Sequence, residues 1–213
     1  LRGNASSSRR ESAAPVLIAG LGSRSITPDA VGPRSADHVI ATRHLISRSP
    51  EFFASWRPVS VLAPGVLGQT GVETGEIVRG VLDHVRPRAV IAIDALAAGR
   101  LSRLVRTVQL ADTGIVPGSG VNNARTALDR QTLGVPVLSI GVPTVADGGS
   151  LAHEIAQQLD GAQCEALDDL SQPFIITTRD IDREVADTAR LIGYAVNMAL
   201  QHISVEEIDL YLS

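Results

Sequence analysis

The sequence predicts a single α/β domain in which a mostly parallel β-sheet carries helices on both faces, as three αβα layers. Short apolar runs alternate with stretches whose apolar residues recur at helical spacing, which is typical of strands joined by crossover helices. The apolar runs show no polar alternation, so both faces of the sheet should be covered. The length of 213 residues suits one such domain, and no internal repeat divides it.

The first half of the chain predicts two strands, each followed by a helix. Residues 16–20 form an apolar run that ends at a glycine, and residues 59–63 form a second run ended by a proline and a glycine. Between them, Thr27-Pro28-Asp29 supplies a cap, a proline at the first helical position and an acid in the first turn. These signals predict a helix over residues 29–47, and apolar side chains at helical spacing predict another over residues 73–85.

The second half begins with the clearest strand pattern of the chain, residues 89–94, which are apolar up to a terminal aspartate. This continuous apolar character predicts a central strand that is buried on both faces. The remaining expected elements are strands at residues 106–110, 136–142 and 174–177, and helices at residues 150–159, 178–201 and 205–212.

The domain boundaries follow from composition. Residues 1–14 are polar and rich in Ser and Arg, so we expect a flexible arm rather than a secretory signal, which needs an apolar segment. The chain opens on Leu rather than Met, and we expect an upstream stretch to be missing. The only later linker-like stretch, residues 160–172, is too short and too late to separate two domains. We therefore expect one domain over residues 15–213.

Composition and charge argue against several classes of function. The net charge of −4 argues against a nucleic-acid binder held by phosphate contacts. No run reaches the roughly 20 apolar residues of a membrane-spanning helix. The single cysteine, Cys164, has no partner for an internal disulfide, which favours a reducing, cytoplasmic compartment. We expect contacts with neither nucleic acid nor membrane.

Two aspartates, Asp29 and Asp94, stand near the ends of predicted strands, where open α/β sheets bind their ligands. Asp29 follows the first strand by a loop and opens a helix, whereas Asp94 directly ends the most apolar strand. Each position also has a structural explanation. An acid in a first helical turn complements the helix dipole, and a buried acid is tolerated when it is paired.

If Asp29 and Asp94 lie close together, their chemistry follows from their charges. Two neighbouring carboxylates cannot both ionise easily, so one of them keeps its proton. The pair can then act as a general base toward water and as a general acid toward a leaving amine. Asp29, beside the positive end of a helix, would be the better anion. The residues alone leave a structural and a catalytic role open for Asp29 and for Asp94.

Other motifs give weaker indications. Gly20-Leu21-Gly22 begins a dinucleotide fingerprint, but Ser25 replaces its third glycine and no acid follows the second strand to bind a ribose. Asp112-Thr113-Gly114 matches the active triplet of pepsin-like proteases, whose folds are nearly all β, so we interpret it as coincidence. Ser119 lacks the spacing of a nucleophile elbow. The histidines lack metal-ligand spacing, and a surface or packing role is favoured for His44.

A series of short blocks extends over about residues 15–200. The blocks are Gly20-Leu21-Gly22, Thr27-Pro28-Asp29-Ala30, Thr42-Arg43-His44, Ala63-Pro64-Gly65-Val66, Gly71-Val72-Glu73-Thr74, Ala92-Ile93-Asp94-Ala95-Leu96, Asp112-Thr113-Gly114-Ile115, Pro117-Gly118-Ser119-Gly120-Val121, Leu133-Gly134-Val135-Pro136 and Gly141-Val142-Pro143-Thr144-Val145. In these blocks the sequence resembles the germination protease family of bacterial spores, which is similar in fold to hydrogenase maturation endopeptidases. So many blocks in the same order make the resemblance specific.

The resemblance implies an activity, a substrate and a site. Members of that family are atypical aspartic endopeptidases, made as zymogens, that cut small acid-soluble spore proteins when a spore germinates. The family's two implicated aspartates fall on Asp29 and Asp94, the pair considered above. With this resemblance we predict both as catalytic residues that need no metal and no cofactor. The resemblance further implies a location in the cytoplasm of the spore core and a homo-oligomer, a tetramer. Segments at residues 67–72 and 112–123 would hold an extended substrate.

Two other functions stay open at this stage, because the chain departs from the family pattern. Ser23 stands where the family commonly has asparagine, Asn122 replaces a usual glycine, and the chain is shorter than typical members. A non-catalytic protein that binds spore proteins would fit the shortened chain. A metal-assisted endopeptidase would resemble the hydrogenase maturation relatives, which bind a metal at comparable carboxylates, although their histidine is missing here.

Overall fold

The computed structural model describes residues 14–118, 125–149, 151 and 174–213. The strands are β1 (Val16–Gly20), β2 (Val59–Leu62), β3 (Ala89–Ala98), β4 (Gln109–Ala111), β5 (Val137–Asp147) and β6 (Ile175–Ile176). The α-helices are α2 (Val31–Asp37), α3 (Arg43–Arg48), α4 (Pro50–Phe53), α5 (Leu67–Thr70), α6 (Thr74–Val85), α7 (Arg130–Leu133), α9 (Ile181–Gln201) and α10 (Val205–Leu212). Short 3₁₀ turns are η1 (Thr27–Asp29) and η2 (Leu101–Arg103).

The strands form one mixed sheet in the order β2-β1-β3-β5-β4, with β6 paired to β5. The four strands β2, β1, β3 and β5 run parallel, whereas β4 and β6 are antiparallel to β5. Parallel strands need crossover connections, and α6 lies in the one that carries the chain from β2 past β1 to β3. The mostly parallel sheet predicted from the alternating pattern is therefore confirmed.

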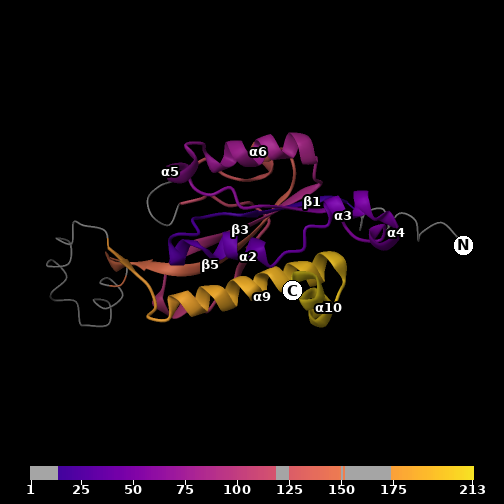
Figure 1. Ribbon diagram of the computed structural model, residues 1–213. Helices are drawn as coiled ribbons and strands as arrows, with labels where there is room; N and C mark the ends of the chain where they lie inside the picture. Colours follow the sequence, from indigo (N-terminus) through magenta and orange to yellow (C-terminus); the bar gives the residue numbers. More distant parts are fainter. Residues whose placement is uncertain (1–13, 119–124, 150, 152–173) are drawn as a thin grey trace, which may run out of the picture.

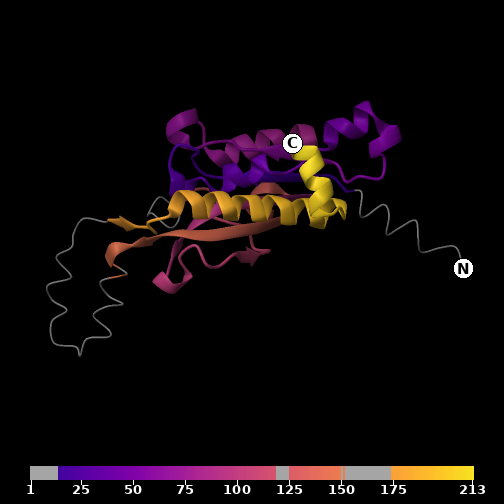
Figure 2. The same cartoon turned by 60° about the horizontal axis from the view of Figure 1, so that its bottom comes forward.

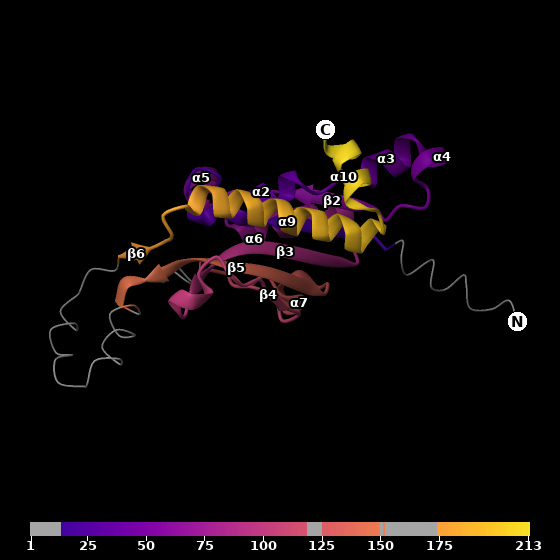
Figure 3. The ribbon, with the colours of Figure 1, turned by 90° about the horizontal axis from the view of Figure 1, so that it is seen from below.

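Helices cover both faces of the sheet, which confirms the predicted three layers. Figure 1 shows α6 on one side of the strands and α9 on the other, and Figures 2 and 3 show α9 running lengthwise along the sheet. The alternation of side chains along β1 divides the core between these faces. Ile18 packs in a buried cluster with Val185 of α9, whereas Leu17 packs in a second cluster with Val78 of α6.

The predicted helix over residues 29–47 is wrong as a single element. The chain instead forms η1, then α2, a turn followed by an irregular stretch at residues 38–42, and finally α3. Asn197 of α9 explains the interruption, because its Oδ1 accepts a hydrogen bond from the Ile40 N–H at 2.9 Å and its Nδ2 donates to the His38 carbonyl at 2.8 Å. A buried side chain distant in sequence thus satisfies backbone groups that a continuous helix would have paired internally.

Agreement with the predicted positions varies among the other described elements: β5 ends five residues later than predicted, and helices α4, α5 and α7 were not predicted. Strands β1 and β2 and helices α6 and α10 agree closely, and α9 begins three residues after its predicted start. Strands β4 and β6 are shorter than expected. The helix predicted at residues 150–159 and the arm predicted at residues 1–14, except its last residue, lie outside the described residues.

Strand β3 is longer than predicted, which corrects the expected setting of Asp94. The strand continues to Ala98 instead of ending at Asp94, and β5 continues beside it. On its other side, β1 ends at Gly20 opposite Ile93. Asp94 therefore does not end a strand but begins the part of β3 that extends beyond β1. The apolar run ends there, yet the pairing with β5 does not.

Helix α2 lies close to the strand ends because two glycines leave room for it. A Cβ on Gly20 would lie 2.3 Å from the carbonyl oxygen of Gly32. A Cβ on Gly32 would lie 2.2 Å from the carbonyl oxygen of Leu21 and 2.3 Å from that of Ile93. Side-chain carbons do not approach backbone oxygens so closely, so the position of α2 depends on glycine at both places.

We predict that Gly32→Ala destabilises the protein by about 1–3 kcal/mol, because the new methyl group meets two backbone oxygens that cannot move independently. Gly80→Ala is the matched control on the exposed face of α6, where no atom lies within 4 Å of the added Cβ. That control should gain about 0.5–1 kcal/mol from its higher helix propensity. Urea unfolding followed by circular dichroism measures both changes, and equal gains for the two variants would contradict the packing described for α2.

Candidate functional site

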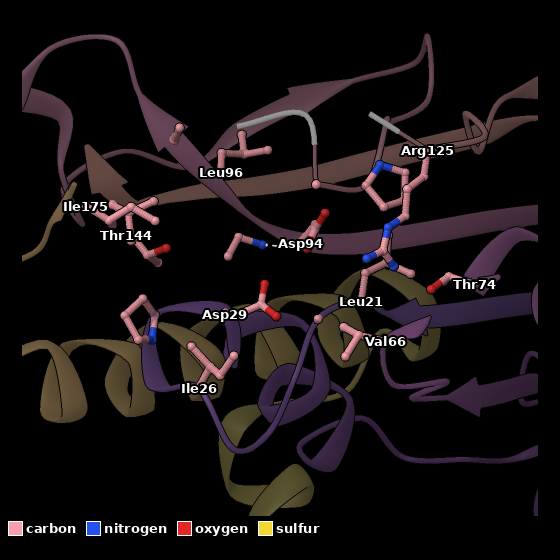
Figure 4. Close-up of a pocket in the computed structure, with 17 residues that line it drawn as sticks. Leu21, Ile26, Asp29, Val66, Thr74, Asp94, Leu96, Arg125, Thr144 and Ile175 are labelled. Atoms are coloured by element: carbon pink, nitrogen blue, oxygen red, sulfur yellow. Dashed lines mark hydrogen bonds between the residues drawn. The ribbon is translucent and has the colours of Figure 1, made fainter. Parts of the chain in front are cut away.

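A cavity of about 370 Å³ lies at the end of the sheet where β1 has stopped and β3 and β5 continue. Its walls come from the segment after β1, from β3 and β5, and from the region around α5 and α6. Asp29 and Asp94 both line it, and Figure 4 shows them on opposite sides of the space. The two aspartates selected from the sequence therefore share one cavity, while their catalytic role is still a prediction.

The turn after β1 positions Asp29. Gly22 has a φ of +106°, and a Cβ at this residue would lie 2.1 Å from the main-chain oxygen of Asp29. The tight turn lets the Ser23 N–H donate a hydrogen bond to Asp29 Oδ2 at 2.7 Å. Because this contact comes from the backbone, it does not depend on which side chain stands at position 23.

Asp94 is held inside the sheet. It pairs in register with Gly141 of β5, and the residue is only 4% exposed. Its Oδ1 accepts a hydrogen bond from the Ala95 N–H at 2.9 Å. A carboxyl group buried to this degree is costly to ionise, because the interior solvates its charge poorly.

The two carboxyl groups are electrostatically unequal. Burial raises the pKa of Asp94 to about 8, the negative charge of Asp29 adds to this increase, and the hydrogen bond from Ala95 opposes it. Burial also raises the pKa of Asp29, but the Ser23 N–H and the positive charge of Arg125 work against that increase. The carboxyls titrate as an interacting pair. Asp29 is the member that ionises more readily, so at neutral pH the proton is held mainly by Asp94.

Three further polar residues line the cavity, Thr74, Arg125 and Thr144, and none was selected as a site residue from the sequence. The Thr74 hydroxyl donates to the Gly65 carbonyl at 3.3 Å. The positive charge of Arg125 acts on Asp29, and its buried Nε has no hydrogen-bond partner among the described residues. Thr144 is 1% exposed, and its Oγ1 likewise has no partner within that part of the chain. Thr144 did carry a signal, since it belongs to one of the blocks that resemble a family, whereas Arg125 belongs to none of them.

The segment predicted to hold a substrate at residues 67–72 lies near the cavity. It contains α5, and Val66 immediately before it lines the cavity. Gln69 Nε2 donates a hydrogen bond to Ser23 Oγ at 2.9 Å, which connects α5 to the turn after β1. The other predicted segment, residues 112–123, lies only partly within the described residues.

Of the other motifs in the sequence, Gly20-Leu21-Gly22 reaches the cavity through Leu21 and Gly22, whereas Asp112 and His44 do not line it. Asp112 is exposed on the loop after β4, and His44 is exposed on α3. Ser119 and Cys164 lie outside the described residues.

Within the described ranges, no group of three or more His, Cys, Asp or Glu residues could hold a metal ion. In the same part of the chain, no helix is long and apolar enough to cross a bilayer.

We predict that Asp94→Asn stabilises the protein, and that the gain grows as the pH rises from 4 to about 8. Between its ordinary pKa near 4 and its folded pKa of about 8, Asp94 is protonated when folded but ionised when unfolded. The folded state therefore binds more protons, and wild-type stability falls with rising pH across this window. Asn carries no proton to lose and avoids that penalty.

Chemical unfolding at pH 4.5 and at pH 8.5 measures this difference. Asp83→Asn, at an exposed position of α6, is the matched control and should follow the wild-type pH dependence. If the stability of Asp94→Asn relative to wild type did not change with pH, the pKa of Asp94 would not be raised in the folded protein.

Comparisons with known proteins identify the family of this chain. The germination protease family model (Peptidase_A25) matches residues 6–160. A germination protease of Caldanaerobacter subterraneus subsp. tengcongensis is 41% identical over 87% of this chain and 66% of its own length. The Clostridium acetobutylicum protein of that name is 36% identical over 98% of this chain and 72% of its own length. The Bacillus subtilis one is 51% identical over 66% of this chain and 39% of its own length.

Among solved structures, the [NiFe] hydrogenase maturation protease HycI from Thermococcus kodakarensis KOD1 aligns with a TM-score of 0.45 and 16% identity. That alignment covers 84% of this chain and 90% of HycI. The sequence matches are much stronger than this structural one. Because the family model covers most of the chain and relatives match nearly all of it at more than 30% identity, the chain belongs to the germination protease family.

Proposed function

We propose that this chain is an endopeptidase of spore germination in which Asp29 and Asp94 together activate the water that hydrolyses a peptide bond. The observation that carries the proposal is the unequal carboxyl pair facing a single cavity. Burial and the charge of Asp29 favour a protonated Asp94, with a pKa of about 8, while Ser23 and Arg125 favour an ionised Asp29. Water activation requires this combination of one base and one acid.

Each carboxyl has a defined part in the proposed reaction. Ionised Asp29 removes a proton from a water molecule as the water oxygen bonds to the peptide carbonyl carbon. Asp94 at the same time gives its proton to the carbonyl oxygen, so the tetrahedral intermediate is neutral. One hydroxyl of the intermediate then returns a proton to Asp94, the carbon–nitrogen bond breaks, and Asp29 gives its proton to the leaving nitrogen. Both aspartates end in their starting protonation states.

The other polar groups of the cavity support these steps. The Ser23 N–H and the guanidinium of Arg125 stabilise Asp29 as an anion, so it stays available as the base near neutral pH. The hydroxyl of Thr144 lines the same cavity and offers a hydrogen-bonding group to a substrate or a water molecule. No step requires a metal or a cofactor.

The substrate and the biological setting of the proposal come from the family. Its name associates the relatives with germination. The proposed substrates are small acid-soluble spore proteins, and the proposed location is the cytoplasm of the spore core. We further propose that the chain assembles as a homo-oligomer, a tetramer as the family resemblance implies, and that its activity is controlled through a zymogen.

We predict that Asp29→Asn and Asp94→Asn each reduce cleavage of a small acid-soluble spore protein by a factor of about 10²–10⁴ or more. Asn occupies nearly the same volume but can neither accept nor release a proton, so each variant loses one catalytic step while keeping its fold. Asp83→Asn, exposed on α6 and remote from the cavity, is the matched control and should cleave like wild type. Gel and mass-spectrometric analysis of timed digests measures the rates.

The other outcomes of the digest separate the rival functions. Wild-type rates in either aspartate variant would remove that residue from the mechanism. Loss of cleavage in a chelator, with recovery on adding a divalent metal, would replace the water activation proposed here by a metal-assisted one. Binding of the spore protein by the wild-type chain without any cleavage would favour a non-catalytic binding protein.

A further inference from the structure

The part of β3 beyond Asp94 has a neighbouring strand on one side only. Strand β1 pairs with β3 from Val16↔Ala89 to Gly20↔Ile93 and stops there, whereas β5 pairs with β3 as far as Ala98. Within the part of the chain that the structure describes, no other strand pairs with β3. Four residues that follow Asp94, 95–98, therefore present an open sheet edge on the β1 side.

The backbone direction along β3 shows which groups face this open edge. The Val90 N–H donates to the Pro136 carbonyl on the β5 side at 2.9 Å, and the Ile93 carbonyl accepts from the Leu21 N–H on the β1 side at 2.8 Å. Successive residues of a strand direct their backbone groups to alternate sides. The N–H and carbonyl groups of Ala95 and Ala97 therefore point to the β1 side, where β1 no longer reaches them. The Ala95 N–H donates instead to Asp94 Oδ1, at 2.9 Å.

The cavity lies along this open edge. Ala95, Leu96 and Ala97 line it from β3, and Ile26 and Pro28 line it from the segment after β1. Figure 4 shows Leu96 and Asp94 on one side of the space and Ile26 and Asp29 on the other. A polypeptide lying along the edge would therefore pass directly beside the two carboxyl groups.

We propose that the substrate binds as an added β-strand along residues 95–98 of β3, so that recognition depends mainly on its backbone. This inference rests on the proposed endopeptidase function and specifies its substrate class, an extended polypeptide segment. Among the described residues, no strand pairs with the Ala95 carbonyl or with the N–H and carbonyl of Ala97 on this side of the mainly apolar cavity. These groups favour a partner with backbone donors and acceptors of its own. Strand addition to an open sheet edge supplies such a partner at regular spacing. A helical segment has no free backbone groups to offer and must unfold to bind.

The test uses overlapping synthetic peptides of a small acid-soluble spore protein and continues with the one that the wild-type chain cleaves or, if none is cleaved, with the one that Asp94→Asn binds most tightly. Each residue of the peptide is N-methylated in turn, which removes one backbone donor and adds a methyl group at the sheet edge. Cleavage by the wild-type chain gives KM and kcat, and fluorescence anisotropy with Asp94→Asn gives binding without turnover. We predict that N-methylation weakens binding about tenfold or more at every second residue and less than about twofold at the residues between.

A variant of the protein tests the other side of the same contact. Ala97→Pro removes a backbone donor that faces the open edge, and proline is tolerated at such unpaired positions of a strand. This variant should keep a melting temperature near that of wild type while raising KM severalfold. If it does not fold, the peptide series alone decides the question.

The results distinguish this inference from the function on which it rests. Cleavage of the unmodified peptide, combined with N-methyl effects that show no two-residue period, would overturn strand addition and leave the endopeptidase intact. An Ala97→Pro variant of normal stability and unchanged KM would do the same. Absence of cleavage would overturn the proposed function, and the binding profile on Asp94→Asn would then decide strand addition by itself. Absence of both cleavage and binding would overturn both.

Discussion

The close contact between α2 and the ends of β1 and β3 is the constraint on which the site depends. Helix α2 approaches the backbone at Leu21 and Ile93 so closely that only glycine fits at Gly20 and Gly32. The 3₁₀ turn that carries Asp29 directly precedes this helix, so the packing of α2 also sets the position of the carboxyl. The site is therefore built on the rigid core of the sheet, and a change in helix packing would separate its two acids.

The environment of each carboxyl then gives it a different tendency to ionise. Asp94 lies within a strand, almost without exposure, whereas Asp29 lies in a turn where a backbone N–H and a cation stabilise its charge. Like charges in one cavity increase the difference, because ionisation of Asp29 makes ionisation of Asp94 more costly. The same early end of β1 that leaves Asp94 facing a cavity also leaves the edge of β3 open beside it. Catalysis and substrate binding are thus proposed to share one structural cause.

Much of this arrangement could be predicted from the sequence, because apolar runs and helical spacing report local burial. The parallel sheet, its two covered faces and the pair of Asp29 and Asp94 were all accessible in this way. The length of β3 was not, since Ala95 to Ala98 carry no strong strand signal and are held by pairing with β5. The break after α2 depends on Asn197, and the electrostatics of Asp29 depend on Arg125, both far away in the sequence. Contacts of this kind exist only once the chain is folded.

The most direct test of the account is a ¹³C NMR titration of the aspartate carboxyl carbons, with the two signals assigned through the Asp29→Asn and Asp94→Asn variants. The account predicts that the Asp94 carboxyl stays protonated at neutral pH and titrates near pH 8, while that of Asp29 ionises at lower pH. In Asp94→Asn, Asp29 should titrate without a coupled second step. If both carboxyls instead titrated independently near pH 4, they would not form a proton-sharing pair, and the proposed mechanism would be wrong.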